Sequence, residues 1–195
     1  MKQDLVLAGV GGQGVLSVAA ILAEAARRLG LQVRQGEVHG MSQRGGAVQA
    51  TLRLSDRPIE GDLVARGGAD MVLGVEPLEA LRYLDYLAPA GRLVTSADPY
   101  ENIPDYPPPE QVLAAVRAIP GAVLVAAGDL ARRAGSGRTA NVVMVGAASA
   151  FLPLPAEVVE ACIGEGFAAK GERVVEANRR AFALGRAAVE GGAGA

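Results

Sequence analysis

The first residues whose types and spacing could carry chemistry form a glycine-rich segment near the start of the chain, Gly9-Val10-Gly11-Gly12-Gln13-Gly14. Glycines 9, 11 and 14 have the G-x-G-x-x-G spacing. Because glycine has no Cβ atom, it allows a tight turn and lets N–H groups at a helix start approach a phosphate or another chain. The same glycines would also serve simply to pack a helix against a strand. The segment therefore predicts a ligand site at Gly11, Gly12, Gln13 and Gly14 or a packing turn.

A second polar segment, His39-Gly40-Met41-Ser42-Gln43-Arg44-Gly45-Gly46, contains the only histidine of the chain. It is expected to be a loop at the end of a strand, where α/β proteins keep their sites. The guanidinium of Arg44 suits a carboxylate or a phosphate, and Ser42 and Gln43 add neutral hydrogen-bonding groups. The alternative is that Arg44 pairs with Glu37 or Asp70 and only pins the loop.

His39 could in principle act as a general base, since histidine titrates near neutral pH. No Ser-His-acid or Cys-His pattern surrounds it, and a lone histidine in a loop more often makes a hydrogen bond or caps an element. A metal site is not predicted, because with one His and one Cys the ligands would have to be carboxylates. The single Cys162 cannot hold an iron–sulfur cluster, which takes four protein ligands, and its apolar helical surroundings predict a buried structural thiol.

A dinucleotide site, a Walker loop and a thiamine diphosphate site would each show a distinct motif in the sequence. A dinucleotide site needs an acidic residue about 20 positions beyond the glycine turn, and Glu37 is close to that place. However, the glycine-rich loop that follows Glu37 would crowd the crevice for an adenosine. No lysine follows the glycines as in a Walker loop. Gly61-Asp62 and Gly128-Asp129 are the only Gly-Asp steps, and neither leads into the Asn pair of a thiamine diphosphate site.

Composition limits the class of protein. The chain has 195 residues, half of them hydrophobic, and a net charge of −2. This length suits one domain, and the scattered arginines give no basic face for nucleic acid. The N-terminus lacks a signal-like apolar region and no apolar run reaches the ~18 residues of a membrane helix, so a cytoplasmic protein without a membrane partner is expected.

Periodicity then indicates the elements that hold these residues. Strands are expected at 4–9, 31–38, 48–54, 70–76, 92–95 and 122–127, and helices at 15–29, 77–87, 110–119, 130–134, 141–152, 156–163 and 170–189. The strand at 31–38 would complete a right-handed βαβ start, and the alternating strand at 48–54 would be antiparallel or at an edge with one solvated face. Prolines make 98–109 an extended surface connection.

Two helices are distinctive. The 141–152 helix is apolar on nearly all sides, so we expect it to be buried between layers. The 170–189 helix is amphipathic, with its apolar face at Val174, Ala177, Ala181, Leu184 and Ala188. Together these elements predict an α/β, Rossmann-like three-layer fold with a mostly parallel sheet and a C-terminal amphipathic helix. One domain would span 1–190, and 191–195 would be a disordered tail.

Four segments together resemble a known family. They are the glycine turn at 9–15, Glu37 with the loop up to Gly46, the 69–80 segment with Glu76-Pro77-Leu78-Glu79, and Asn141-Val142-Val143-Met144-Val145-Gly146-Ala147. They resemble the gamma-type subunit or domain of the 2-oxoacid:ferredoxin oxidoreductases, and within these most the small subunit of indolepyruvate:ferredoxin oxidoreductases. The His-Gly-Met-Ser form of the loop favours arylpyruvates over pyruvate, 2-oxoglutarate and branched-chain oxoacids.

This resemblance implies a function within a complex. The family decarboxylates a 2-oxoacid on thiamine diphosphate, passes electrons through iron–sulfur clusters to ferredoxin and releases an acyl-CoA. A partner chain would carry the thiamine and the clusters, since this chain has motifs for neither, and this chain would support assembly and access of coenzyme A. The implied ligand- or partner-binding residues are Gly11, Gly12, Gln13, Gly14, His39, Ser42, Gln43, Arg44, Gly45, Gly46 and Asn141. The alternative is a free-standing nucleotide-binding Rossmann-like protein.

Overall fold

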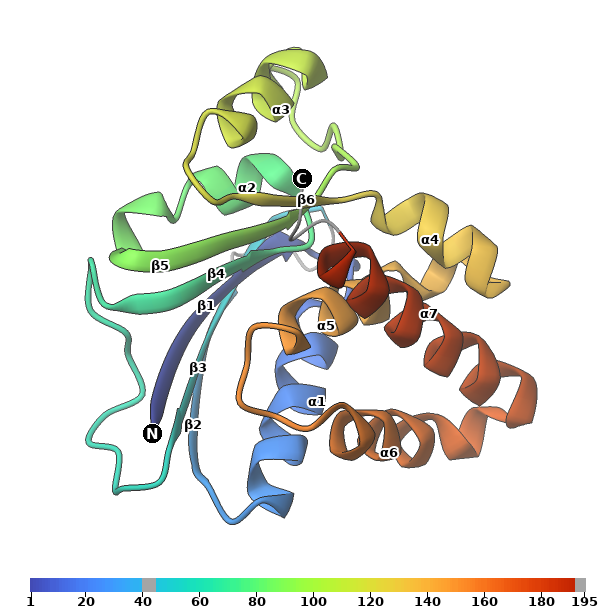
Figure 1. Ribbon diagram of the computed structural model, residues 1–195. Helices are drawn as coiled ribbons and strands as arrows, with labels where there is room; N and C mark the ends of the chain where they lie inside the picture. The colour runs from blue at the N-terminus through green and yellow to red at the C-terminus, as the bar shows by residue number, and fades with distance from the viewer. Residues whose placement is uncertain (40–44, 192–195) are drawn as a thin grey trace.

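The computed structural model describes residues 1–39 and 45–191, with His39 described by its backbone alone. In these ranges a single sheet of six strands has the order β2-β3-β1-β4-β5-β6 (Figure 1). The strands are β1 Lys2–Val10, β2 Gln32–His39, β3 Ala47–Ser55, β4 Ala69–Gly74, β5 Leu87–Ser96 and β6 Val123–Val125. Only β3 runs opposite to the others. The prediction of a mostly parallel sheet is confirmed.

The place of β3 differs from the expectation for a βαβ start. β3 pairs antiparallel with β1 on one side and with β2 on the other, so the strand after the first helix is parallel to β1 without lying beside it. The antiparallel direction of β3 is thus confirmed, whereas the alternative position at an edge is wrong. Its polar face is also not solvated, because Thr51 and Arg53 donate side-chain hydrogen bonds to carbonyl groups of residues 60–63, which cover that face.

Helices cover both faces of the sheet, which gives three layers (Figure 1). The larger core lies between the sheet and a layer formed by α1 Val15–Arg28, α4 Ala127–Ala134, α5 Ala140–Ser149, α6 Ala156–Phe167 and α7 Glu172–Glu190. The smaller core lies on the opposite face, beneath α2 Pro77–Leu81 and α3 Pro109–Arg117. Three short 3₁₀ turns complete the described structure, η1 Leu84–Tyr86, η2 Gly137–Thr139 and η3 Ala168–Lys170.

The central strand shows why both faces need covering. Leu5 and Leu7 of β1 belong to the larger core, while Val6 between them belongs to the smaller one. Side chains alternate between the two faces of a strand, so a continuous apolar strand buries both of its faces. As predicted, α5 is a buried helix: every residue from 142 to 149 is buried between the sheet side and α7.

Several boundaries differ from the predicted ones. The helix expected at 77–87 ends at Leu81 and is followed by η1, and Leu87 already begins β5, which is therefore longer than the predicted 92–95 strand. In α7, Ala188 is exposed and Val189 is buried in its place. Residues 97–108 hold no helix or strand, as expected for the proline-rich connection. Of the predicted tail, Gly191 still donates its N–H to the carbonyl of Ala187, and 192–195 lie outside the described residues.

Candidate functional site

The glycine turn leaves β1 and enters α1 at the carboxyl end of the parallel strands. The N–H of Gln13 donates to the carbonyl of Val10 at 3.0 Å, and the N–H of Val10 donates back to the side-chain Oε1 of Gln13 at 2.8 Å. Gly12 has φ 101° and Gly14 has φ 83°, a region that favours glycine. The turn is therefore closed by Gln13 and depends on glycine at two positions.

The second glycine segment lies directly against this turn. Gly11 donates its N–H to the carbonyl of Gly46 at 2.8 Å, and Gly45 donates its N–H to the carbonyl of Gly11 at 3.3 Å. These bonds continue the antiparallel pairing of β1 with β3, in which Gly9 lies opposite Val48. Segments that are 35 residues apart in the chain thus form one glycine-lined edge. The sequence alone could not predict that Gly11 lies against Gly45 and Gly46, because this contact depends on the pairing of β3 with β1.

Asn141 belongs to the same region. It lies in the first turn of α5, and a Cβ atom built on Gly14 would come within 2.6 Å of its Nδ2 atom. Gly14 is therefore needed for the close approach of α1 and α5 as well as for its φ angle. Around Gly12, in contrast, no described atom lies within 4 Å of a built Cβ, so no described residue would obstruct a ligand at that position. A small hollow of about 260 Å³ lies there, lined by Gly11, Gly12 and Gly14 among others.

The proline-rich connection also reaches the glycine edge. Asn102 donates from its Nδ2 to the carbonyl of Gly45 at 2.8 Å. The connection is held at two other points by the side chain of Glu76, which accepts a hydrogen bond from the N–H of Tyr100 at 3.3 Å and from the hydroxyl of Tyr106 at 2.5 Å. We call residues 97–108 the strap. The sequence signalled Glu76 through its motif, but not its contact with the strap.

Glu76 is fully buried, with 0% of its surface exposed, and it also caps α2 by accepting from the N–H of Glu79 at 2.7 Å. Burial, then the hydrogen bond to Glu76, raises the pKa of the Tyr106 hydroxyl, which therefore remains a donor at alkaline pH. Burial also raises the pKa of Glu79, and its Oε2 is a buried oxygen that has no hydrogen-bond partner among the described residues. The side chain of Glu76 therefore fixes the strap to the start of α2.

The side chains of four predicted site residues lie outside the described part of the structure. Ser42, Gln43 and Arg44 lie outside the described residues, and of His39 only the backbone is described, at the end of β2 and opposite Val48. Glu37 lies on β2, and β3 separates that strand from β1. In a conventional dinucleotide site the acidic residue ends the strand adjacent to the glycine turn. Glu37 is displaced by one strand, about 5 Å, from that position.

The one cysteine of the chain does not fit an iron–sulfur cluster, one of the two resident cofactors that the resemblance implies for the complex. An iron–sulfur cluster takes about four cysteine ligands, and the one cysteine, Cys162, is buried between helices, where burial raises its thiol pKa. The two Gly-Asp steps of the sequence both lie in ordered surroundings. Gly128-Asp129 lies inside α4, and the carbonyl of Asp62 accepts a hydrogen bond from Thr51. In the described ranges no group of three His, Cys, Asp or Glu residues could hold a metal ion, and no helix is long and apolar enough to cross a membrane.

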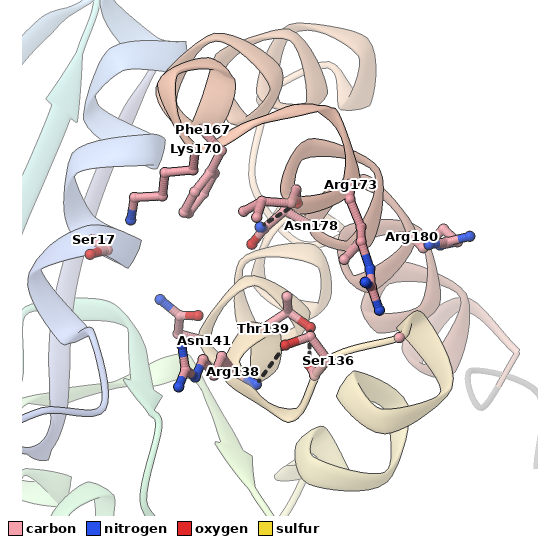
Figure 2. A pocket seen from close by; sticks show the side chains of 13 residues that line it. Ser17, Ser136, Arg138, Thr139, Asn141, Phe167, Lys170, Arg173, Asn178 and Arg180 are labelled. Atoms are coloured by element: carbon pink, nitrogen blue, oxygen red, sulfur yellow. Dashed lines mark hydrogen bonds between the residues drawn. The ribbon is translucent and has the colours of Figure 1, made fainter.

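A larger pocket of about 550 Å³ begins one helical turn beyond the glycine turn (Figure 2). Ser17 of α1 and Asn141 of α5 form its inner wall, and residues of η3 and α7 form the other side. Asn141 therefore connects the glycine turn with this pocket. Of the residues that line this pocket, the sequence predicted only Asn141 as a site residue, because the lining comes from three separate stretches of the chain, at Ser17, 135–141 and 167–180.

Solved structures of known proteins share the fold described above. The gamma subunit of a keto/oxoacid ferredoxin oxidoreductase from Geobacter sulfurreducens has a TM-score of 0.71 and 25% sequence identity, covering 97% of this chain and 99% of that chain. The 2-oxoglutarate:ferredoxin oxidoreductase from Magnetococcus marinus, solved with 2-oxoglutarate, coenzyme A and succinyl-CoA, has a TM-score of 0.78 at 22% identity, which shows a shared fold. The present chain spans 31% of that longer chain.

The sequence comparisons are more specific. The indolepyruvate oxidoreductase subunit IorB of Thermococcus kodakarensis is 40% identical over 196 residues, which cover 95% of each chain. A family model described as pyruvate ferredoxin/flavodoxin oxidoreductase matches residues 4–188, a span that includes the glycine turn, Glu76, Asn141 and most of α7. The chain belongs to the pyruvate ferredoxin/flavodoxin oxidoreductase family.

Proposed function

We propose that this chain is the gamma-type subunit of a cytoplasmic 2-oxoacid:ferredoxin oxidoreductase that acts on indolepyruvate or a related arylpyruvate. The complex converts the oxoacid to an acyl-CoA and carbon dioxide and reduces ferredoxin. A partner subunit carries the thiamine diphosphate and the iron–sulfur clusters. The 40% identity to an indolepyruvate oxidoreductase subunit over nearly the whole of both chains supports this assignment. The domain that would perform this role is the predicted 1–190 unit.

The two glycine segments of this chain lie against each other, and this observation supports a binding role for the chain in the complex. Hydrogen bonds between Gly11 and both Gly45 and Gly46 create an edge without side chains at the carboxyl end of β1. Beside it, the first turn of α1 has no side-chain cap on its N–H groups, because Gly14 is the N-cap residue. N–H groups at a helix start attract anions, and bare backbone lets another chain approach closely. The edge therefore suits the partner subunit, a phosphate of coenzyme A, or both.

The contacts at the glycine edge indicate the role of individual residues of this chain. Gln13 holds the turn closed, the side chain of Asn141 lies directly beside Gly14, and Asn102 of the strap fixes the carbonyl of Gly45. The hollow at Gly12 is the part of the edge where a ligand or partner backbone fits. Coenzyme A, when bound, supplies the thiol that accepts the acyl group. These residues would position the phosphate-bearing end of coenzyme A, and the lack of side chains at the edge would leave room for it at the interface. Arg44, Ser42 and Gln43 remain predicted contributors from the same loop.

The test is to co-express this chain with the thiamine-carrying subunit and measure assembly and indolepyruvate-dependent reduction of ferredoxin. We expect a stable complex whose activity requires both chains and coenzyme A. Gly12→Val should leave the chain folded but lower complex yield or raise the apparent KM for coenzyme A, because it fills the hollow. Gly121→Val, also at positive φ with no described atom near the built Cβ but at a turn before β6, is the matched control for backbone strain.

Two outcomes contradict the proposal. Full activity of the catalytic subunit without this chain would remove it from the reaction. Micromolar binding of NAD or FAD to the isolated chain, abolished by Gly12→Val, would instead support the alternative of a free-standing nucleotide-binding protein.

A further inference from the structure

The 550 Å³ pocket differs from the glycine edge because cationic side chains line it. Arg138 of η2, Lys170 of η3 and Arg173 of α7 line it, and none of its described lining residues is acidic. Figure 2 shows Lys170 extending toward Ser17 and Arg173 extending toward Ser136. Three cationic side chains from separate segments therefore surround one concave space.

These charges have no partner within the described part of the chain. No carboxylate there lies within ion-pair distance of Arg138, Lys170 or Arg173, whereas most other arginines of the described residues, Arg28 and Arg186 among them, are paired with an acid. Arg180, at the outer margin, lies 3.9 Å from Glu176. The three side chains are exposed, so solvent screens part of their mutual repulsion, and an anion in the pocket would offset the rest. The pocket thus has an excess of positive charge.

The floor of the pocket adds neutral polar groups that are themselves ordered. Thr139 and Asn178 are buried, with 4% and 3% of their surfaces exposed, and each side chain donates a hydrogen bond to a carbonyl group, Thr139 to Ser136 and Asn178 to Val174. Thr139 is also the N-cap residue of α5 and leaves the first N–H groups of that ten-residue helix without a side-chain cap. The cations and the helix start favour a negatively charged ligand.

We propose that this pocket binds the phosphate groups of a nucleotide-type ligand. Its volume lies in the range of small-molecule sites, roughly 300–1,000 Å³, and leaves space beyond the charged groups for the organic part of the ligand. Phe167 provides a flat apolar wall for that part, with the Lys170 ammonium 5.1 Å from its ring centroid. A flat acidic protein surface would not fill such a concave space.

Two sources share this phosphate chemistry. One is a free nucleoside diphosphate, and the other is the phosphoadenosine end of coenzyme A. The second source rests on the proposed function, since Ser17 and Asn141 connect the pocket with the glycine edge. Binding of simple phosphates to the full chain tests the pocket whether or not the complex assembles.

The experiment is isothermal titration of the full chain with inorganic pyrophosphate, ADP, coenzyme A and dephospho-coenzyme A, at low and at high salt. The variant is Lys170→Gln with Arg173→Gln, and the control is Arg117→Gln at the end of α3, on the opposite face of the sheet. We expect one site, at least about tenfold weaker in the double variant and unchanged in the control, because each charged hydrogen bond to phosphate contributes strongly. High salt should weaken binding. Melting curves verify that each variant is folded.

The ligands distinguish the sources. Tighter binding of coenzyme A than of dephospho-coenzyme A supports the proposal and assigns the pocket to the 3′-phosphate, whereas equal binding of ADP and coenzyme A supports it and assigns the diphosphate. Failure of all four ligands to bind, or equal binding by the double variant, overturns it. If the double variant loses only the partner subunit in co-purification while phosphates do not bind, the cations belong to a protein interface and the proposal is wrong. An active complex with no phosphate binding at this pocket would leave the proposed function standing.

Discussion

The hydroxyl of Tyr106 provides the sharpest test of how the strap is held. Its 2.5 Å hydrogen bond to the buried carboxyl group of Glu76 is one of two bonds that join the strap to this N-cap residue of α2, and Tyr106→Phe removes it without changing the ring. A hydrogen bond to a charged group contributes about 1.5–3 kcal/mol. Tyr106 is half-buried, so water can replace part of the lost bond, and we expect a loss of about 1–2 kcal/mol.

The expected loss has a global and a local readout. For a domain of this size a loss of 1 kcal/mol lowers Tm by about 2–4 °C, so Tyr106→Phe should melt about 2–8 °C lower. The N–H of Tyr100, which donates to the same carboxyl group, should exchange with solvent about tenfold faster for each 1.4 kcal/mol by which the strap is loosened. Thermal melting and hydrogen exchange of the full chain measure the two quantities separately.

Tyr86→Phe is the matched control, because Tyr86 is also half-buried but its hydroxyl makes no hydrogen bond to another described residue. It should melt within about 1 °C of the original chain. If Tyr106→Phe leaves both Tm and the exchange of the Tyr100 N–H unchanged, Glu76 does not hold the strap. If Tm falls but the exchange does not change, Tyr106 supports the core and not the strap.

Two further predictions concern stability. Gly185→Ala should cost about 1–3 kcal/mol or prevent folding, since its Cβ would overlap the carbonyl of Val143 where α7 crosses α5, whereas Gly166→Ala, whose Cβ meets open space in α6, should be neutral or stabilising in urea unfolding. Burial would raise the pKa of Asp4, but hydrogen bonds from Arg53 and Lys2 outweigh it and lower that pKa. The stabilisation from Asp4 is therefore present above its ordinary pKa of 3.8 and is lost as pH falls through the lower folded value. Arg53→Gln should reduce stability at pH 7 and flatten its fall toward pH 2, and equal urea midpoints for this variant and Arg34→Gln, an exposed control, would contradict that account.

The features that the sequence determined are local or nearly so. The glycine turn between a strand and a helix, the all-apolar α5 and the amphipathic α7 follow from residue spacing, because a helix or strand places every third or every second side chain on one face. The family could likewise be recognised from short motifs at fixed places. Cys162 as a buried thiol followed from its apolar neighbours and is confirmed.

The sequence could not decide which strands lie side by side. The periodicity of residues 48–54 is the same whether β3 lies at an edge or between β1 and β2, since only the covering of its polar face by residues 60–63 makes the central place favourable. Once β3 is there, Gly45 and Gly46 necessarily meet Gly11, and Glu37 leaves the place of a dinucleotide-binding acid.

The strap and the basic pocket depend still more on the tertiary structure. Glu76 and Tyr106 are 30 residues apart, and Ser17 and Lys170 belong to opposite ends of the chain. Contacts of this kind result from the packing of whole layers, which minimises exposed apolar surface across the entire domain and is not encoded in any one segment. The sequence therefore determined the elements and the glycine turn, and the packing of the layers alone brought the cations of η2, η3 and α7 around one pocket.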